Sequence, residues 1–150
     1  MINKSFSSTL IILEKKNLND RIYTNNESLK AAIKDFNERP IVYGQINWPE
    51  DGRGDVTLSK ASHTINNVRI VNNKVIGDIT ILNTVHGRIL NKNLHNYVFR
   101  SSSIVSVDPI NNIVNIDRIK SFDAIELDDD PFEDIAEIRK RKMLNIKNKC

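Results

Sequence analysis

Two alternating apolar segments, separated by one Asn-Asn dipeptide, restrict the possible folds of this chain more than any other feature. Residues 61–71 and 74–82 are rich in β-branched residues and alternate apolar with polar side chains. Asn72 and Asn73 between them tolerate the positive φ angles that tight hairpin turns require. The pattern predicts a half-buried antiparallel β ribbon.

The other segments predict an α+β domain around this ribbon. Apolar runs indicate strands at 6–13, 41–46, 97–107 and 113–127, and 3.6-residue periodicity indicates helices over 27–37 and from position 83 or 84 to about 95. Asn25 or Asn26 is a suitable N-cap for the first helix, and Pro40 ends it. Gly and Pro residues predict a loop over 48–56. We therefore expect a mostly antiparallel, β-barrel-like sheet with two or three helices.

Length and charge indicate one compact domain followed by a charged tail. The chain has 150 residues, enough for a core without disulfides or metals, and its single cysteine is Cys150. We place the domain at 1–128 and the tail at 129–150, where an acidic block precedes a basic one. This order suits a helix over about 131–143, either solvated or in contact with a partner protein. The net charge of +3 does not indicate nucleic-acid binding, and no apolar run is long enough to span a membrane.

Several short motifs occur in the same order, and at nearly the same spacing, as in one known family. The segments concerned are NLNDRIY at 17–23, GQINWPE at 44–50, ASHTI at 61–65, GDITILNT at 77–84 with GRIL at 87–90, SS at 101–102 and FDAI at 122–125. Together they resemble the prohead core proteases of tailed bacteriophages, which are related in fold to the herpesvirus assembly protease. The resemblance covers roughly residues 9 to 132.

The resemblance implies a serine endopeptidase that processes scaffold and capsid proteins during head maturation. A serine hydroxyl becomes a nucleophile only with a base beside it, so Ser-His is the minimum pair for acyl transfer. By resemblance, His63 is the base, Ser102 the nucleophile and Asp123 the acid that orients the imidazole. Ser101 is the alternative nucleophile, and Asp117 is a weaker candidate for the acid.

Departures from the family's motifs leave a second function open. The family's Arg-Gly after the serine pair is replaced here by Ser103-Ile104, where an oxyanion-hole donor is expected. Losing such a donor typically costs about two to three orders of magnitude in rate. The alternative is therefore a catalytically lapsed homologue that is retained as an auxiliary or decoration capsid protein. Either function implies capsid and scaffold partners and an oligomeric or capsid-bound protein, in the host cytoplasm during assembly and in the prohead or virion capsid.

The other histidines and the single tryptophan give weaker indications of function. His86 and His95 have a spacing that does not suit a shared metal, so we expect no metal and no cofactor. His63 itself is also interpretable as a structural histidine on a strand. Trp48, in the Gly/Pro loop, is either a half-buried packing residue or an anchor for a partner.

Overall fold

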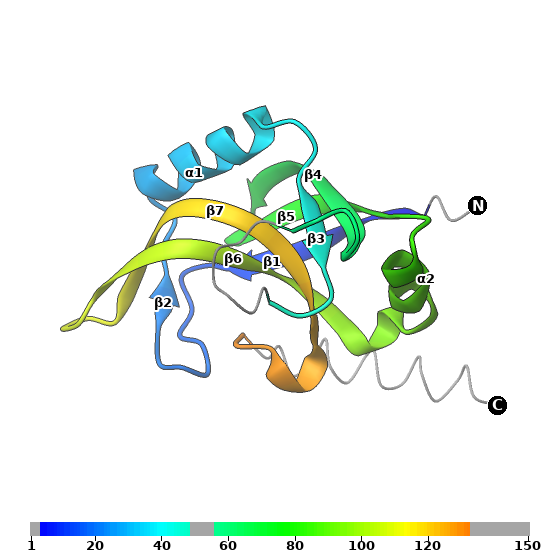
Figure 1. Ribbon diagram of the computed structural model, residues 1–150. Coiled ribbons are helices and arrows are strands. Elements are labelled where there is room, and N and C mark those ends of the chain that lie inside the picture. The colour runs from blue at the N-terminus through cyan, green and yellow to red at the C-terminus, as the bar shows by residue number, and fades with distance from the viewer. Residues whose placement is uncertain (1–3, 49–55, 133–150) are drawn as a thin grey trace.

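The computed structural model describes residues 4–48 and 56–132, in which seven strands and two α-helices follow one another (Figure 1). The strands are β1 Ser5–Ile12, β2 Ile22–Tyr23, β3 Tyr43–Gln45, β4 Ala61–Val71, β5 Lys74–Ile81, β6 Tyr97–Asp108 and β7 Ile113–Glu126. The helices are α1 Glu27–Glu38 and α2 Val85–Lys92, and two short 3-10 turns, Leu94–Asn96 and Leu127–Asp129, follow α2 and β7. The α+β class and the Asn72-Asn73 hairpin are confirmed, with φ values of 48° and 61° at the two asparagines.

The expected barrel-like sheet is wrong, because the strands form two separate open sheets. One has the order β1-β5-β4-β3 and the other the order β2-β7-β6. All pairings are antiparallel except β2 with β7. A single parallel bridge from Ile46 to Ala124 connects β3 to β7. This bridge does not close a barrel, since the next residue, Asn47, adopts the left-handed φ of 68° and ends the extended run.

Helix α1 covers the core side of β7 (Figure 1). The Asn26 side chain accepts a hydrogen bond from the Leu29 amide at 3.0 Å, which caps the first turn as predicted. The apolar face of α1 is buried and consists of Leu29, Ala32, Ile33 and Phe36. The Phe36 ring meets the Phe122 ring edge-on, with centroids 5.1 Å apart, so the helix packs directly over the middle of β7.

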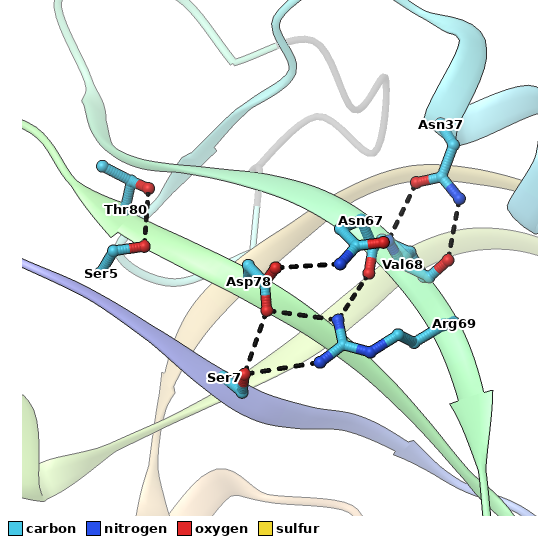
Figure 2. A network of polar contacts seen from close by, with 8 residues as sticks. All are labelled: Ser5, Ser7, Asn37, Asn67, Val68, Arg69, Asp78 and Thr80. Atoms are coloured by element: carbon cyan, nitrogen blue, oxygen red, sulfur yellow. Dashed lines mark hydrogen bonds and ion pairs between the residues drawn. The ribbon is translucent and has the colours of Figure 1, made fainter.

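A polar network on β4 and β5 connects α1 to the first sheet and fixes a bulge there (Figure 2). The Asn37 amide donates to the Val68 carbonyl at 2.8 Å and accepts from the Val68 amide at 3.0 Å, so it acts as a short substitute for a neighbouring strand. Asp78 accepts hydrogen bonds from Ser7, Asn67 and Arg69 at 3.0 to 3.2 Å. Within the β4 bulge between Asn66 and Arg69, Asn37 thus satisfies the Val68 backbone, and the Arg69 guanidinium donates to the Asn67 carbonyl at 2.8 Å.

Helix α2 is held at the start of β4. The Thr84 hydroxyl accepts from the Gly87 amide at 2.9 Å and donates to the Ala61 carbonyl at 2.6 Å. One residue therefore caps the helix and attaches it to the strand that carries Ser62 and His63.

Residues directly after the boundary predicted at 128 lie against the compact body. Asp130 and Phe132 lie against the compact body, and the Leu18 amide donates to the Pro131 carbonyl at 3.0 Å. Most of the predicted helix over 131–143 lies outside the described residues. No helix in the described part of the chain is long and apolar enough to cross a membrane.

Candidate functional site

His63 lies on β4, where its imidazole connects the two sheets. Nε2 lies 2.8 Å from the Phe122 carbonyl oxygen of β7, and Nδ1 lies 2.7 Å from the Ser62 hydroxyl. A carbonyl only accepts hydrogen bonds, so Nε2 carries the proton and Nδ1 of the neutral ring accepts from Ser62. Both ring nitrogens are therefore used within the described part of the chain.

The imidazole is enclosed on every side that the structure describes. Ser62 and His63 each have 0% exposure, and the Phe99 ring of β6 packs edge-on against the imidazole at 4.9 Å between centroids. Gly44 lies so close that a Cβ there would overlap both the His63 ring and the Phe122 carbonyl. Burial lowers the pKa of His63 to about 4, although the Phe122 hydrogen bond opposes this shift. The ring is therefore neutral near pH 7.

Asp123 is also buried, but its hydrogen bonds go elsewhere. Its Oδ1 accepts from the Gln45 amide at 3.1 Å and its Oδ2 accepts from the Ser121 hydroxyl at 3.0 Å. Burial raises the pKa of Asp123 to about 6, while these two hydrogen bonds partly oppose the shift. The other candidate for the acid, Asp117, is exposed on β7. No hydrogen bond within the described residues joins His63 to either aspartate.

The three serines lie on β6 beside β7, and alternation along the strand separates them. Ser101 is paired with Phe122 and Ser102 with Ser121. Directly opposed residues of an antiparallel pair share a face, so Ser101 lies on the face of Phe122 and Ser102 lies on the face of Ser121 and Asp123. Since the ring of Phe99 meets His63, Ser101 rather than Ser102 shares the strand face that is turned to the histidine.

The structure thus brings together the three strands that carry the predicted triad, but not the triad itself. None of the hydrogen bonds among the described residues links His63, Ser102 and Asp123. The histidine instead has a nucleophile-type partner in Ser62, at the distance that proton transfer requires. That hydroxyl is fully buried, so no substrate reaches it in this conformation.

Sequence reasoning missed the partners that His63 uses. Ser62 precedes the histidine in the same motif, but its role was not identified. Gly44 and Phe122 each begin a motif that carries the resemblance, but neither motif indicated contact with His63, because that contact arises only from the crossing of β3, β4 and β7. The described residues contain no group of three His, Cys, Asp or Glu side chains arranged to hold a metal.

Comparisons with known proteins identify a solved structure with a similar overall fold. The chain matches no protein-family model and no curated protein sequence. Among solved structures it is similar to the bacteriophage T4 capsid assembly protease, gp21, with a TM-score of 0.65 and 21% sequence identity over 82% of this chain and 81% of that one. At this identity the similarity establishes the fold, which is that of a phage capsid assembly protease.

Proposed function

We propose that this protein works in the assembly of a tailed-phage head as a non-catalytic homologue of the capsid assembly protease, in contact with capsid or scaffold proteins. The observation that carries the proposal is the state of His63. Both ring nitrogens are hydrogen-bonded to Ser62 and Phe122, and the ring has no exposed surface. His63 then connects the two sheets in the way a structural histidine does.

The electrostatics of the site support the same conclusion. A general base works best when its pKa is near the working pH, because it must be unprotonated and still basic enough to take a proton. Burial holds the pKa of His63 near 4, far below that range. Asp123 does not compensate, since its two oxygens accept from Gln45 and Ser121 rather than from the imidazole.

The sequence around the serines gives independent support. Ser103 and Ile104 stand where the resembling family has Arg-Gly, and the Ser103 hydroxyl is a buried group without a hydrogen-bond partner among the described residues. An oxyanion hole requires preorganised donors aimed at the developing charge. The replacement removes the arginine side chain and the glycine of the family's motif, so Ser103-Ile104 does not reproduce the family's arrangement at this position.

The test is quantitative mass spectrometry of mature phage particles. We expect the chain to be present at a copy number comparable to capsid subunits and uncut through Cys150. A head-maturation protease is expected to be consumed and lost, so absence of the chain from mature heads, or its recovery only as fragments, contradicts the proposal.

A second candidate function is serine endopeptidase activity during head maturation, with His63, Ser102 and Asp123 as the triad. Its support is the convergence of strands: His63 contacts Phe99 on the serine strand and bonds to Phe122, the residue before Asp123. Activity requires release of Nε2 from Phe122. Scaffold processing that stops with Ser102→Ala, but continues with Ser101→Ala and with the control Ser106→Ala on the same strand, supports this function; a stop with Ser101→Ala alone assigns the nucleophile to Ser101 instead. Normal processing with all three variants excludes it.

A further inference from the structure

The exposed side of α2 carries an arrangement that the His63 site does not explain. Val85 and Ile89 are 63% and 45% exposed, one turn apart, and Arg88 and Lys92 lie on the same side of the helix and are also exposed. The opposite side of α2 is buried through Gly87 and Leu90. An ordinary solvated helix face is polar, so two large apolar residues beside two cations indicate a surface that contacts a partner.

A cavity continues this surface onto the body of the protein. It has a volume of about 340 Å³ and lies between α2 and the residues that follow β3. Ile89 and His86 line it from the helix, Trp48 and Asn47 from the loop, and Lys60 from the turn before β4. Trp48 is 40% exposed, so its indole is available at the rim. We call Trp48, Lys60, Val85, Arg88, Ile89 and Lys92 the α2 surface.

The charge of the α2 surface is uniformly positive. Helix α2 contains no acidic residue, and Lys60, Arg88 and Lys92 take part in no ion pair within the part of the chain that the structure describes. The complementary partner is a segment with carboxylates around apolar side chains. Such pairing adds electrostatic steering to apolar burial. Phosphate and sugar are contacted by cationic and polar side chains and by backbone amides, so the exposed Val85 and Ile89 favour a partner that also offers apolar side chains.

The chain itself contains a segment with this chemistry. Residues 133–138 read Glu-Asp-Ile-Ala-Glu-Ile, so three acidic residues are interspersed with Ile135 and Ile138. This segment begins directly after Phe132, which is fixed to the body by contact of its ring with Tyr23 (5.3 Å between centroids) and by the Arg100 guanidinium 5.4 Å from the ring centroid.

We propose that the α2 surface of one copy binds residues 133–138 of a second copy. The contact is heterologous, since two different patches meet, so repetition produces rings or open chains rather than a symmetric dimer alone. The isoleucines fill the cavity between Trp48 and Ile89, and the three carboxylates face Lys60, Arg88 and Lys92. This inference does not depend on whether the His63 site is catalytic.

The test is sedimentation equilibrium of the full-length chain, with charge-reversal variants. The wild type is expected to self-associate, and added salt should weaken the association because surface charges are screened. Arg88→Glu/Lys92→Glu and, separately, Glu133→Lys/Glu137→Lys should each weaken self-association at least tenfold. The matched control Lys30→Glu/Lys34→Glu, at the same spacing on α1, should leave it unchanged.

Mixing the two charge-reversed variants decides between a specific contact and a general loss of association. A 1:1 mixture pairs reversed cations with reversed acids and should restore complexes that neither variant forms alone. The proposal is overturned if the wild type remains monomeric at several hundred micromolar, if the control weakens association equally, or if mixing restores nothing. Binding of the α2 surface to a capsid protein while the chain alone stays monomeric also overturns it. Circular dichroism of each variant shows that lost association is not lost folding.

Discussion

The buried ion pair between Arg100 and Asp130 leads to the most quantitative prediction. Both side chains are 2% exposed, and the carboxylate takes two hydrogen bonds from the guanidinium, at 2.8 Å from Nε and 2.9 Å from Nη2. Nη1 donates to the carbonyls of Thr9 at 2.8 Å and Phe99 at 3.1 Å. The pair therefore holds the segment after β7 against β1 and β6.

Asp130→Ala removes the one carboxylate that pairs with this guanidinium among residues 4–48 and 56–132. Two charge-assisted hydrogen bonds are lost and a cation remains buried, for which the expected loss is about 3–5 kcal/mol of unfolding free energy. The backbone carbonyls still accept from Nη1, so a value toward the lower end is expected. The exposed pair of Lys30 with Glu27, at 3.2 Å, is the matched comparison, and Glu27→Ala should cost less than about 1 kcal/mol.

Urea denaturation measures both changes. With a slope of about 1–3 kcal/mol per molar urea, the Asp130→Ala midpoint should fall by roughly 1–3 M with the slope unchanged. The double variant Arg100→Met/Asp130→Leu should recover most of the loss, because it leaves no unpaired charge. A loss below about 1 kcal/mol for Asp130→Ala would refute the reasoning, since it would mean that water reaches Arg100 once the carboxylate is gone.

Three further predictions concern the His63 site and its supports. Gly44→Ala should destabilise the protein by about 2 kcal/mol or more, because the added Cβ overlaps His63 and the rigid Phe122 carbonyl; thermal unfolding measures this, and an unchanged Tm contradicts it. Thr84→Ala should cost about 1 kcal/mol through loss of the α2 cap, whereas a cost near zero in urea denaturation would show that the cap is dispensable. In Asp123→Asn, stability should fall by up to about 3 kcal/mol as the pH drops from 6.5 to 4, because the unfolded chain takes up a proton on this histidine that the buried, neutral His63 of the folded state does not. In the wild type, protonation of Asp123 adds a similar amount of unfolding free energy as the pH falls from 6 to 4, since the raised pKa of Asp123 favours the protonated acid in the folded state. The wild-type plot of stability against pH should therefore be much flatter than that of Asp123→Asn. Parallel plots for the two proteins contradict this prediction.

Local patterns in the sequence predicted the elements well because each depends on nearby residues. The Asn72-Asn73 turn, the Asn26 cap and the apolar face of α1 all lie within one turn or one hairpin. The barrel was wrong because sheet closure depends on pairing between distant strands. Asn47, with its left-handed φ, ends the extended run after β3, and no local pattern indicates how strands then meet across the fold.

The candidate site shows the same limit at the scale of one residue. The sequence placed His63, Ser102 and Asp123 on three strands, and the structure brings those strands together. Which side chains meet depends on the alternation of each strand, and a shift of one position moves a side chain to the opposite face. Ser101, not Ser102, thus shares the face turned to His63, and the Phe122 carbonyl takes the bond that an acid was expected to accept.

The titration of the His63 imidazole by NMR tests the central claim most directly. The account predicts a neutral ring protonated on Nε2 at pH 7, a pKa of about 4, and no change with Ser102→Ala. A pKa near 7, a proton on Nδ1, or a shift of the titration with Ser102→Ala would show that the histidine serves the serine and not the connection between the two sheets.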